Sequence, residues 1–319
     1  MPHCLREISS LPAPIVDPMS KRGWVLFVAM CFIWGVPYLL IRVAVRDLSP
    51  ADLVFARTSI AALILVPIAA WRGVLGGLRG HWKWVLAYTA VELTIPWLLL
   101  SSAEEHLTSS FAGLLVAGVP LVGIGITRLL GLQEEMTARR WLGLLIGIAG
   151  VASLVGLQVG EVDMTAVLEI AFVAVGYALG PLILSHRLGA APGLAVVAAS
   201  LAVTAVVYAP FAIVRPPDHM SGKVVWSVIG LAVICTALAF VVFFWLIGEI
   251  GPTRATVITY VNPAVAIALG VAVLGEHVTT GMAIGFPLVL IGSYFATARK
   301  PGEPGSEAIV VEDAVVSPG

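Results

Sequence analysis

The chain contains very little charge for its length. Only 12% of its 319 residues are Asp, Glu, Lys or Arg, whereas 59% are hydrophobic. Soluble globular proteins carry about 25% charged and about 45 to 50% apolar residues, so this composition excludes a water-soluble domain and indicates a chain that lies in lipid. A formal net charge of −1 leaves no strongly basic face, which argues against nucleic acid as a partner.

Residues that would form a catalytic or metal site are also scarce. The three cysteines, Cys4, Cys31 and Cys235, are too few and too scattered for a disulfide framework or a metal site. The six histidines form no H-E-x-x-H motif, and no G-x-x-x-x-G-K-[ST] loop is present. We therefore expect no catalytic residues, no cofactor and no metal.

Long apolar runs fill most of the chain. A helix needs about 20 apolar residues to cross a bilayer, and ten windows satisfy this length. The runs do not alternate apolar and polar residues, as a membrane β-barrel would. The sequence therefore predicts an all-α integral membrane protein with ten transmembrane helices, at residues 24–45, 52–71, 84–102, 108–130, 141–158, 164–185, 190–214, 224–248, 253–274 and 278–297.

The distribution of Lys and Arg predicts the orientation. In one set of alternate joints lie Arg42, Arg46, Arg215 and Lys223, whereas Arg57 falls inside a span and the remaining thirteen of the 18 basic residues lie in the other set. Because positive charge accumulates in cytoplasmic loops, both ends are expected in the cytoplasm of a cell-membrane protein. Residues 1–22 and 299–319 are polar, with either Met1 or Met19 as the start, and we expect cytoplasmic disordered tails.

The same motif occurs twice. Pro120 is followed by Leu132-Gln133-Glu134-Glu135-Met136-Thr137, and Pro263 by Leu274-Gly275-Glu276-His277-Val278-Thr279; each copy then has two glycines at matching distances, at 143 and 150 and at 285 and 292. Each copy joins the fourth and fifth spans of a half, which predicts five-helix repeats at 23–158 and 159–298. An odd number of spans inverts the second repeat, an arrangement typical of secondary transporters.

Several of these motifs together resemble the EamA family of the drug/metabolite transporter superfamily. The resemblance covers roughly residues 23–298 and includes Trp34-Gly35-x-Pro37, Arg57, the duplicated L-x-E-x-x-T string, Thr236-Ala237-Leu238-Ala239-Phe240 and Gly251-Pro252-Thr253-Arg254-Ala255. It implies two inverted repeats around a central cavity lined mainly by spans one, three, four, six, eight and nine. Gln133 departs from the family pattern, and Glu92 is not a residue associated with the family.

Glu92 and Arg57 are the ionisable residues inside the predicted spans that suggest function. A carboxylate at the middle of span three is costly unless it is paired, protonated or wet, so Glu92 is either a proton-coupling or substrate-binding group or a neutral structural acid. Helical spacing places Tyr88, Glu92 and Pro96 on one face. Arg57 either snorkels to the interface, binds backbone carbonyls or pairs with Glu92.

Aromatic and polar residues on the expected lining helices complete the candidate site. We predict that the substrate contacts Trp34, Tyr38, Glu92, Trp97, Tyr177, Thr236, Tyr260 and Asn262, with Glu92 and Arg57 as the coupling or ion-pairing residues. Glu134 and Glu276 precede Thr137 and Thr279, two expected helix N-caps, which favours an anchoring role over a gating one. Gly143-x3-Gly147 and Gly281-x3-Gly285 favour close packing within one molecule over a dimer contact.

These observations predict a secondary transporter that moves a small metabolite or drug-like molecule across the cytoplasmic membrane by alternating access, as an exporter. The alternatives are a membrane-embedded channel or scaffold, or an intramembrane enzyme without a recognisable catalytic motif. The expected partners are a small-molecule substrate and the lipid bilayer, with the protein either a monomer or a homodimer.

Overall fold

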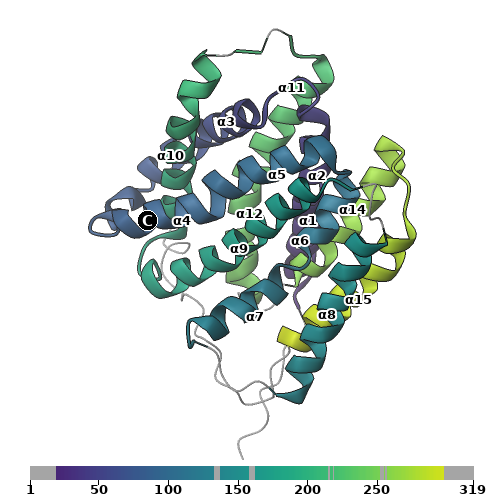
Figure 1. Ribbon diagram of the computed structural model, residues 1–319. Coiled ribbons are helices and arrows are strands. Elements are labelled where there is room, and N and C mark those ends of the chain that lie inside the picture. The colour runs from purple at the N-terminus through teal and green to yellow at the C-terminus, as the bar shows by residue number, and fades with distance from the viewer. Residues whose placement is uncertain are drawn as a thin grey trace, which may run out of the picture.

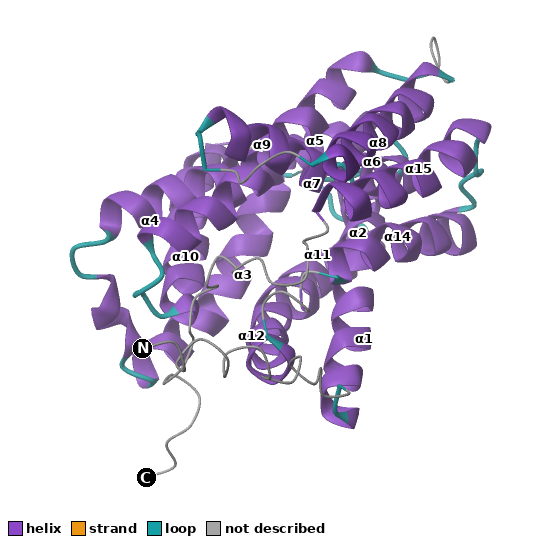
Figure 2. Ribbon diagram, turned by 90° about the horizontal axis from the view of Figure 1, so that it is seen from below, coloured by secondary structure: helices purple, strands orange, loops and turns teal. Residues whose placement is uncertain are grey.

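Within the described residues the chain is entirely helical (Figures 1 and 2). The computed structural model describes residues 19–132, 137–157, 162–214, 216–217, 219–251, 255 and 257–297. In these ranges nine helical stretches are long and apolar enough to cross a membrane. Ile258–Leu274 is apolar but has only 17 residues, and residues 252–254 and 256, which belong to the same expected span, lie outside the described ranges. The all-helical prediction is confirmed, while both predicted tails fall largely outside the described ranges.

Within the described residues, four of the spans are built from more than one helical segment. In chain order the segments are α1 (Lys21–Gly35), α2 (Pro37–Ala44), α3 (Pro50–Trp71), the 3-10 turn η2 (Val74–Leu78), α4 (Trp82–Tyr88), the π helix η3 (Thr89–Thr94), α5 (Ile95–His106), α6 (Ser109–Val116), α7 (Val119–Leu129), α8 (Ala138–Gly156), α9 (Met164–Arg187), α10 (Gly193–Val214), α11 (Gly222–Ile229), the π helix η4 (Gly230–Leu238), α12 (Ala239–Ile250), α14 (Ile258–Leu274) and α15 (Thr280–Thr297).

Prolines divide two of the spans. Pro37 begins α2 directly after α1, and Pro120 lies in the first turn of α7 directly after α6. Proline has no N–H and is accommodated in the first turn of a helix, where that donor has no helical partner. Pro263 instead lies inside α14, so the two prolines of the duplicated motif have different local surroundings.

The third and eighth spans each contain a π helix. Pro263 follows Pro120 by 143 residues, and the same shift carries Thr89–Thr94 onto positions 232–237, inside η4. π turns are rare and occur frequently at functional sites. The two halves therefore share an irregularity at matching positions, which no helical propensity of the individual residues predicts.

Glycines allow α8 and α15 to pack side by side (Figure 1). A Cβ atom at Gly292 would collide with the backbone of Gly147, and one at Gly285 would lie 2.7 Å from the Gly150 carbonyl oxygen. Both helices therefore need glycine at these positions. The prediction that the glycine patterns serve packing within one molecule is confirmed.

Both predicted helix caps are also present. The Thr137 hydroxyl accepts from the Arg140 N–H at 3.3 Å, at the start of α8, and the Thr279 hydroxyl accepts from the Met282 N–H at 3.2 Å, at the start of α15. Glu134 lies outside the described residues, so its predicted anchoring role has no structural description.

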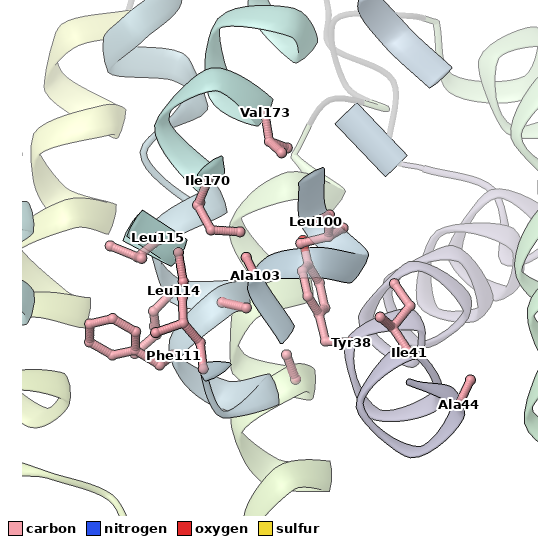
Figure 3. Packing of buried hydrophobic residues seen from close by; sticks show 14 of the residues in the cluster. Tyr38, Ile41, Ala44, Leu100, Ala103, Phe111, Leu114, Leu115, Ile170 and Val173 are labelled. Atoms are coloured by element: carbon pink, nitrogen blue, oxygen red, sulfur yellow. The ribbon is translucent and has the colours of Figure 1, made fainter. Parts of the chain in front are cut away.

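The largest buried cluster lies where α2, α5, α6 and α9 meet. Figure 3 shows Tyr38 of α2 beside Leu100 of α5, with Phe111 of α6 and Ile170 of α9 in the same cluster. A second cluster packs α3 and α4 against α10. The polar groups described next lie between or beside these two apolar regions.

Candidate functional site

Arg57 lies in the interior of the protein. Its side chain is 7% exposed, and its Nε donates a 2.8 Å hydrogen bond to the Thr236 hydroxyl of η4. The guanidinium carbon lies 3.7 Å from the ring centroid of Trp97 in α5. A cation over an aromatic face is stabilised by the negative potential of the ring. The snorkelling expected from the sequence is therefore not what the structure shows.

Thr236 lies in the π helix η4. Its hydroxyl also donates to the carbonyl oxygen of Leu231, five residues earlier, at 2.7 Å. Arg57 belongs to the first predicted half and Thr236 to the second. The bond between them therefore joins the two halves in the interior.

Glu92 lies in the other π helix. Its Oε2 atom is buried without a hydrogen-bond partner within the described residues. The carboxyl group occupies the space over Gly180 of α9, where a Cβ would collide with it, and Pro96 packs in the same way over Gly176. No ion pair joins Glu92 to Arg57 in the described part of the chain. The two residues predicted as a possible pair are therefore not paired with each other in this structure.

Tyr177 of α9 links the surroundings of Glu92 to those of Arg57. Its hydroxyl group is near enough to the charged groups of Glu92 and Arg57 to interact electrostatically with each, and it lies close to the Trp97 indole. Tyr38 is in range of Tyr177 from α2. Thr236 and Trp97 contact Arg57 directly and Tyr177 lies near it, whereas Tyr38 and Glu92 are linked to it through Tyr177. These are five of the predicted site residues: Tyr38, Glu92, Trp97, Tyr177 and Thr236. We call these five and Arg57 the central cluster.

Three other predicted site residues lie elsewhere. Trp34 packs against Phe243 and Phe240 of α12, with ring centroids 4.7 and 6.2 Å apart. The Asn262 amide, oriented with its nitrogen as donor, reaches the carbonyl oxygens of Cys31 at 3.2 Å and Ile258 at 2.9 Å. Tyr260 shares a 2.8 Å hydrogen bond with Thr297 of α15.

Glu104 is a buried carboxyl that sequence reasoning missed. It is completely buried, and neither of its carboxyl oxygens has a hydrogen-bond partner within the described ranges. The apolar window of span three ends at residue 102, so the pair Glu104-Glu105 looks like a solvated helix end. In the structure α5 continues to His106, and only Glu105 of the two faces outward.

Glu276 binds the start of a helix from the other half. Its carboxylate accepts hydrogen bonds from the backbone N–H groups of Ser109 and Ser110 at 2.8 and 2.9 Å, and from their hydroxyls at 2.9 and 2.5 Å. Gly270 in α14 leaves room for this carboxylate, because a Cβ there would collide with it. A carboxylate is well placed on these N–H groups, which have no partner inside α6. We call this arrangement the Glu276 cap.

Two more contacts join the halves at the same end of the bundle. Asp47, after α2, accepts from the Ser221 N–H at 2.8 Å, and Glu169 of α9 accepts from the Ser102 hydroxyl at 2.8 Å. The Ser221 N–H holds the pKa of Asp47 below its usual range. At the opposite end, Ser20 donates to Glu249.

A crevice outside the central cluster has an apolar lining, unlike the cluster itself. It has a volume of about 450 Å³ and is lined by apolar residues of α6, α7, α8 and α9 and the joints beside them, including Leu121, Ile148 and Ile170. No group of three or more His, Cys, Asp or Glu residues that could hold a metal ion occurs among the residues that the structure describes.

Comparison with known proteins identifies the family. The chain matches the EamA-like transporter family over residues 21–156 and again over residues 164–298. The chain belongs to the EamA-like transporter family. This confirms the resemblance read from the motifs and makes the protein a membrane transporter.

Individual relatives agree with this membership over nearly their whole lengths. The inner membrane transporter YedA of Escherichia coli K12 is 26% identical over 300 residues, covering 90% of this chain and 94% of YedA. The transporter YvbV of Bacillus subtilis is 24% identical over 304 residues, covering 92% and 98%. A solved crystal structure with 23% identity superimposes with a TM-score of 0.62 and covers 86% of this chain and 96% of its own, so the two chains share a fold. The chain is thus a multi-pass cell-membrane protein.

Proposed function

We propose that the protein is a secondary transporter that exports a small metabolite or drug-like molecule across the cytoplasmic membrane by alternating access. The observation that carries this proposal is the bond between Arg57 of α3 and Thr236 of η4. It places a permanent cation in the interior, where the two predicted halves meet. Secondary transporters bind their substrates near the midplane, between such halves.

The chemistry of Arg57 favours a substrate with a carboxylate or another planar anionic group. A guanidinium has five N–H donors in a fixed fork that matches a carboxylate, and the bond to Thr236 occupies the Nε donor. The rings of Trp97, Tyr177 and Tyr38 supply apolar and aromatic surface for the rest of the molecule. Pockets of this type combine apolar walls with a few polar groups.

Glu92 has the coupling role in this proposal, either binding a proton or contacting a cationic group of the substrate. Its buried oxygen without a partner supports this role, because such a carboxyl is stable when it is protonated or meets a ligand. Trp34, Tyr260 and Asn262 lie outside the central cluster in this structure. In our proposal they contact the substrate at another stage of the cycle.

We further propose that residues 23–158 and 159–298 form two inverted repeats with both termini in the cytoplasm. Two consecutive family matches and two π helices at matching positions support the duplication. The asymmetry of Lys and Arg supports the orientation. This topology places Glu104, Glu276 and Asp47 at the outer end and the Ser20–Glu249 contact at the cytoplasmic end.

Counterflow in proteoliposomes tests the transport function. A melting-shift screen over amino acids, purines, sugars and organic cations selects the substrate, and a saturable counterflow of that substrate is then expected. Arg57→Lys keeps the charge but loses the fork and the stacking geometry, so we expect at least about a tenfold weaker apparent affinity, equivalent to about 1.4 kcal/mol. Faster uptake into inside-out than right-side-out vesicles is expected for an exporter.

A matched control is available in the same chain. Arg187 at the end of α9 lies 4.7 Å from the ring centroid of Trp84, so Arg187→Lys changes a similar cation and ring contact away from the central cluster. This variant is expected to transport normally. Non-saturating flux would indicate a channel instead, and an Arg57→Lys variant with unchanged affinity would remove Arg57 from the binding site.

A further inference from the structure

Glu104 is the most deeply buried of the described ionisable residues, and the proposed binding site does not use it. It lies in the last turn of α5 and is 0% exposed. Both of its carboxyl oxygens are buried without a hydrogen-bond partner within the described part of the chain. An ionised carboxylate removed from water costs far more than a neutral one unless donors replace the water. The described surroundings offer an ionised Glu104 no such donors, so they favour the neutral, protonated carboxyl.

Charged groups nevertheless surround Glu104. From α2, the Arg42 guanidinium donates to the backbone carbonyl oxygens of Glu104 and Glu105 at 2.5 and 3.0 Å. The other groups in electrostatic range are Arg57 of α3, Glu276 after α14, Tyr38 of α2 and Tyr177 of α9. Glu105, His106 and Glu169 lie farther out at the same end and interact with one another. The guanidinium groups of Arg42 and Arg57 are thus near Glu104 without forming an ion pair with it within the described residues. Either could stabilise an ionised Glu104 if water entered or if the helices moved.

The Glu276 cap connects the charge on Glu104 to the contact between α6 and the segment after α14. Glu276 accepts four hydrogen bonds at the start of α6, and only Leu107 and Thr108 separate α6 from α5, which carries Glu104. A negative charge on Glu104 would repel the Glu276 carboxylate in a region with little water to screen it. Ionisation of Glu104 therefore opposes the contact that joins the two halves.

We propose that Glu104 is a proton-binding carboxyl that holds a proton while the Glu276 cap is formed and releases it to water when that end of the bundle opens. The ligand is a proton from the aqueous phase, which binds a carboxylate oxygen and gives the neutral acid. Because binding and conformation are linked, the state that binds the proton more tightly is favoured by acid. This inference rests on the proposed alternating access for its place in a cycle, while proton binding by Glu104 is measurable without any substrate.

The first experiment detects the proton directly. The full-length protein in lipid nanodiscs is titrated with alkali while infrared difference spectra record the stretch of protonated carboxyl groups. We expect a band that Glu104→Gln removes and that Glu105→Gln, the adjacent exposed carboxyl, leaves in place. Glu92→Gln removes a separate contribution if Glu92 is also protonated. A spectrum of Glu104→Gln that matches the wild type would overturn the proposal.

The second experiment measures opening. Ala112→Cys in a background without the three native cysteines places a thiol on α6 at a position that is 0% exposed, and an impermeant maleimide is applied at different pH values. Labelling is corrected with a free-thiol standard for the pH dependence of the maleimide reaction. We expect it to rise with pH, by up to about tenfold for each tenfold difference in proton affinity between the two states.

The variants separate the proposal from its alternatives. In Glu104→Gln the corrected labelling should stay low and independent of pH, because the amide mimics the neutral acid; a wild-type pH profile in this variant contradicts the proposal. If Glu104→Gln does not insert, Glu104→Asp keeps the carboxyl and is expected to displace the pH profile, and an unchanged profile counts against us. If Glu104 is found to bind a proton but no substrate flux is measured, the proposed transport function is refuted and the proton-binding role of Glu104 is not.

Discussion

Replacing Thr236 by valine tests whether Arg57 is held in place by the second half of the protein. The substitution keeps the volume of a fully buried side chain and removes the acceptor that lies 2.8 Å from the Arg57 Nε. A buried donor that loses its partner costs about 1–3 kcal/mol. The cation–π contact with Trp97 remains, so we expect the free energy of unfolding to fall by about this amount rather than by the larger cost of an isolated buried charge.

The assay is equilibrium unfolding in mixed micelles of increasing SDS content, applied to Thr236→Val, Arg57→Met and the double variant. Thr204→Val is the matched control, because Thr204 is equally buried and its hydroxyl pairs at 2.8 Å with the neutral Thr94 hydroxyl. That loss should be about 0.5–1.5 kcal/mol. A coupling energy between Arg57 and Thr236 below about 0.5 kcal/mol would refute the reasoning, since contacting residues normally exceed that value.

Three further predictions use the same unfolding assay. Gly292→Ala should lower stability by about 1–3 kcal/mol through the clash with α8, whereas Gly156→Ala, where a Cβ meets nothing within 4 Å, should be neutral; equal effects would contradict the packing argument. Asp47→Asn should lower stability at neutral pH and not in acid. The lowered pKa of Asp47 means that its carboxylate stabilises the fold above the ordinary pKa, and this contribution is lost as the pH falls through the lowered value. A stability difference between wild type and variant that is the same at every pH would be inconsistent with the bond to Ser221. Glu276→Gln should lower stability by about 1–3 kcal/mol, because the amide nitrogen cannot accept hydrogen bonds; an unchanged midpoint would show that the cap is weak.

Hydropathy and repeated motifs predict the membrane spans because each depends on local composition. The caps at Thr137 and Thr279 and the glycines of α8 and α15 follow from short patterns in the same way. Arg57 and Glu104 do not, because their surroundings come from residues far away in the chain. Arg57 meets Thr236, 179 residues away, and Glu104 meets side chains from α2, α3 and α9.

The π helices are a second reason why the surroundings of the buried residues could not be predicted from the sequence. A strict 3.6-residue period predicts that Tyr88, Glu92 and Pro96 share a face. Glu92 and Pro96 do both pack on α9, although η3 interrupts the α-helical period between Tyr88 and Ile95. No residue type in Thr89–Thr94 marks a π turn, since the turn is selected by packing against α9 and α10. The contact between Glu92 and Gly180 is therefore a result of tertiary structure.

The π helices also have a consequence for how this sequence can vary. A π turn corresponds to one residue inserted into an α helix, and each residue of an α helix advances by about 100°. Deleting a single residue from η3 would restore a regular helix and rotate α5 by about that angle against α4. This rotation would break two contacts at once, that of Trp97 with Arg57 and that of Glu104 with Arg42. Single-residue insertions and deletions should therefore be far less tolerated within η3 and η4 than substitutions at the same positions, and a deletion scan of both segments compared with a substitution scan would show this as a larger loss of folded protein.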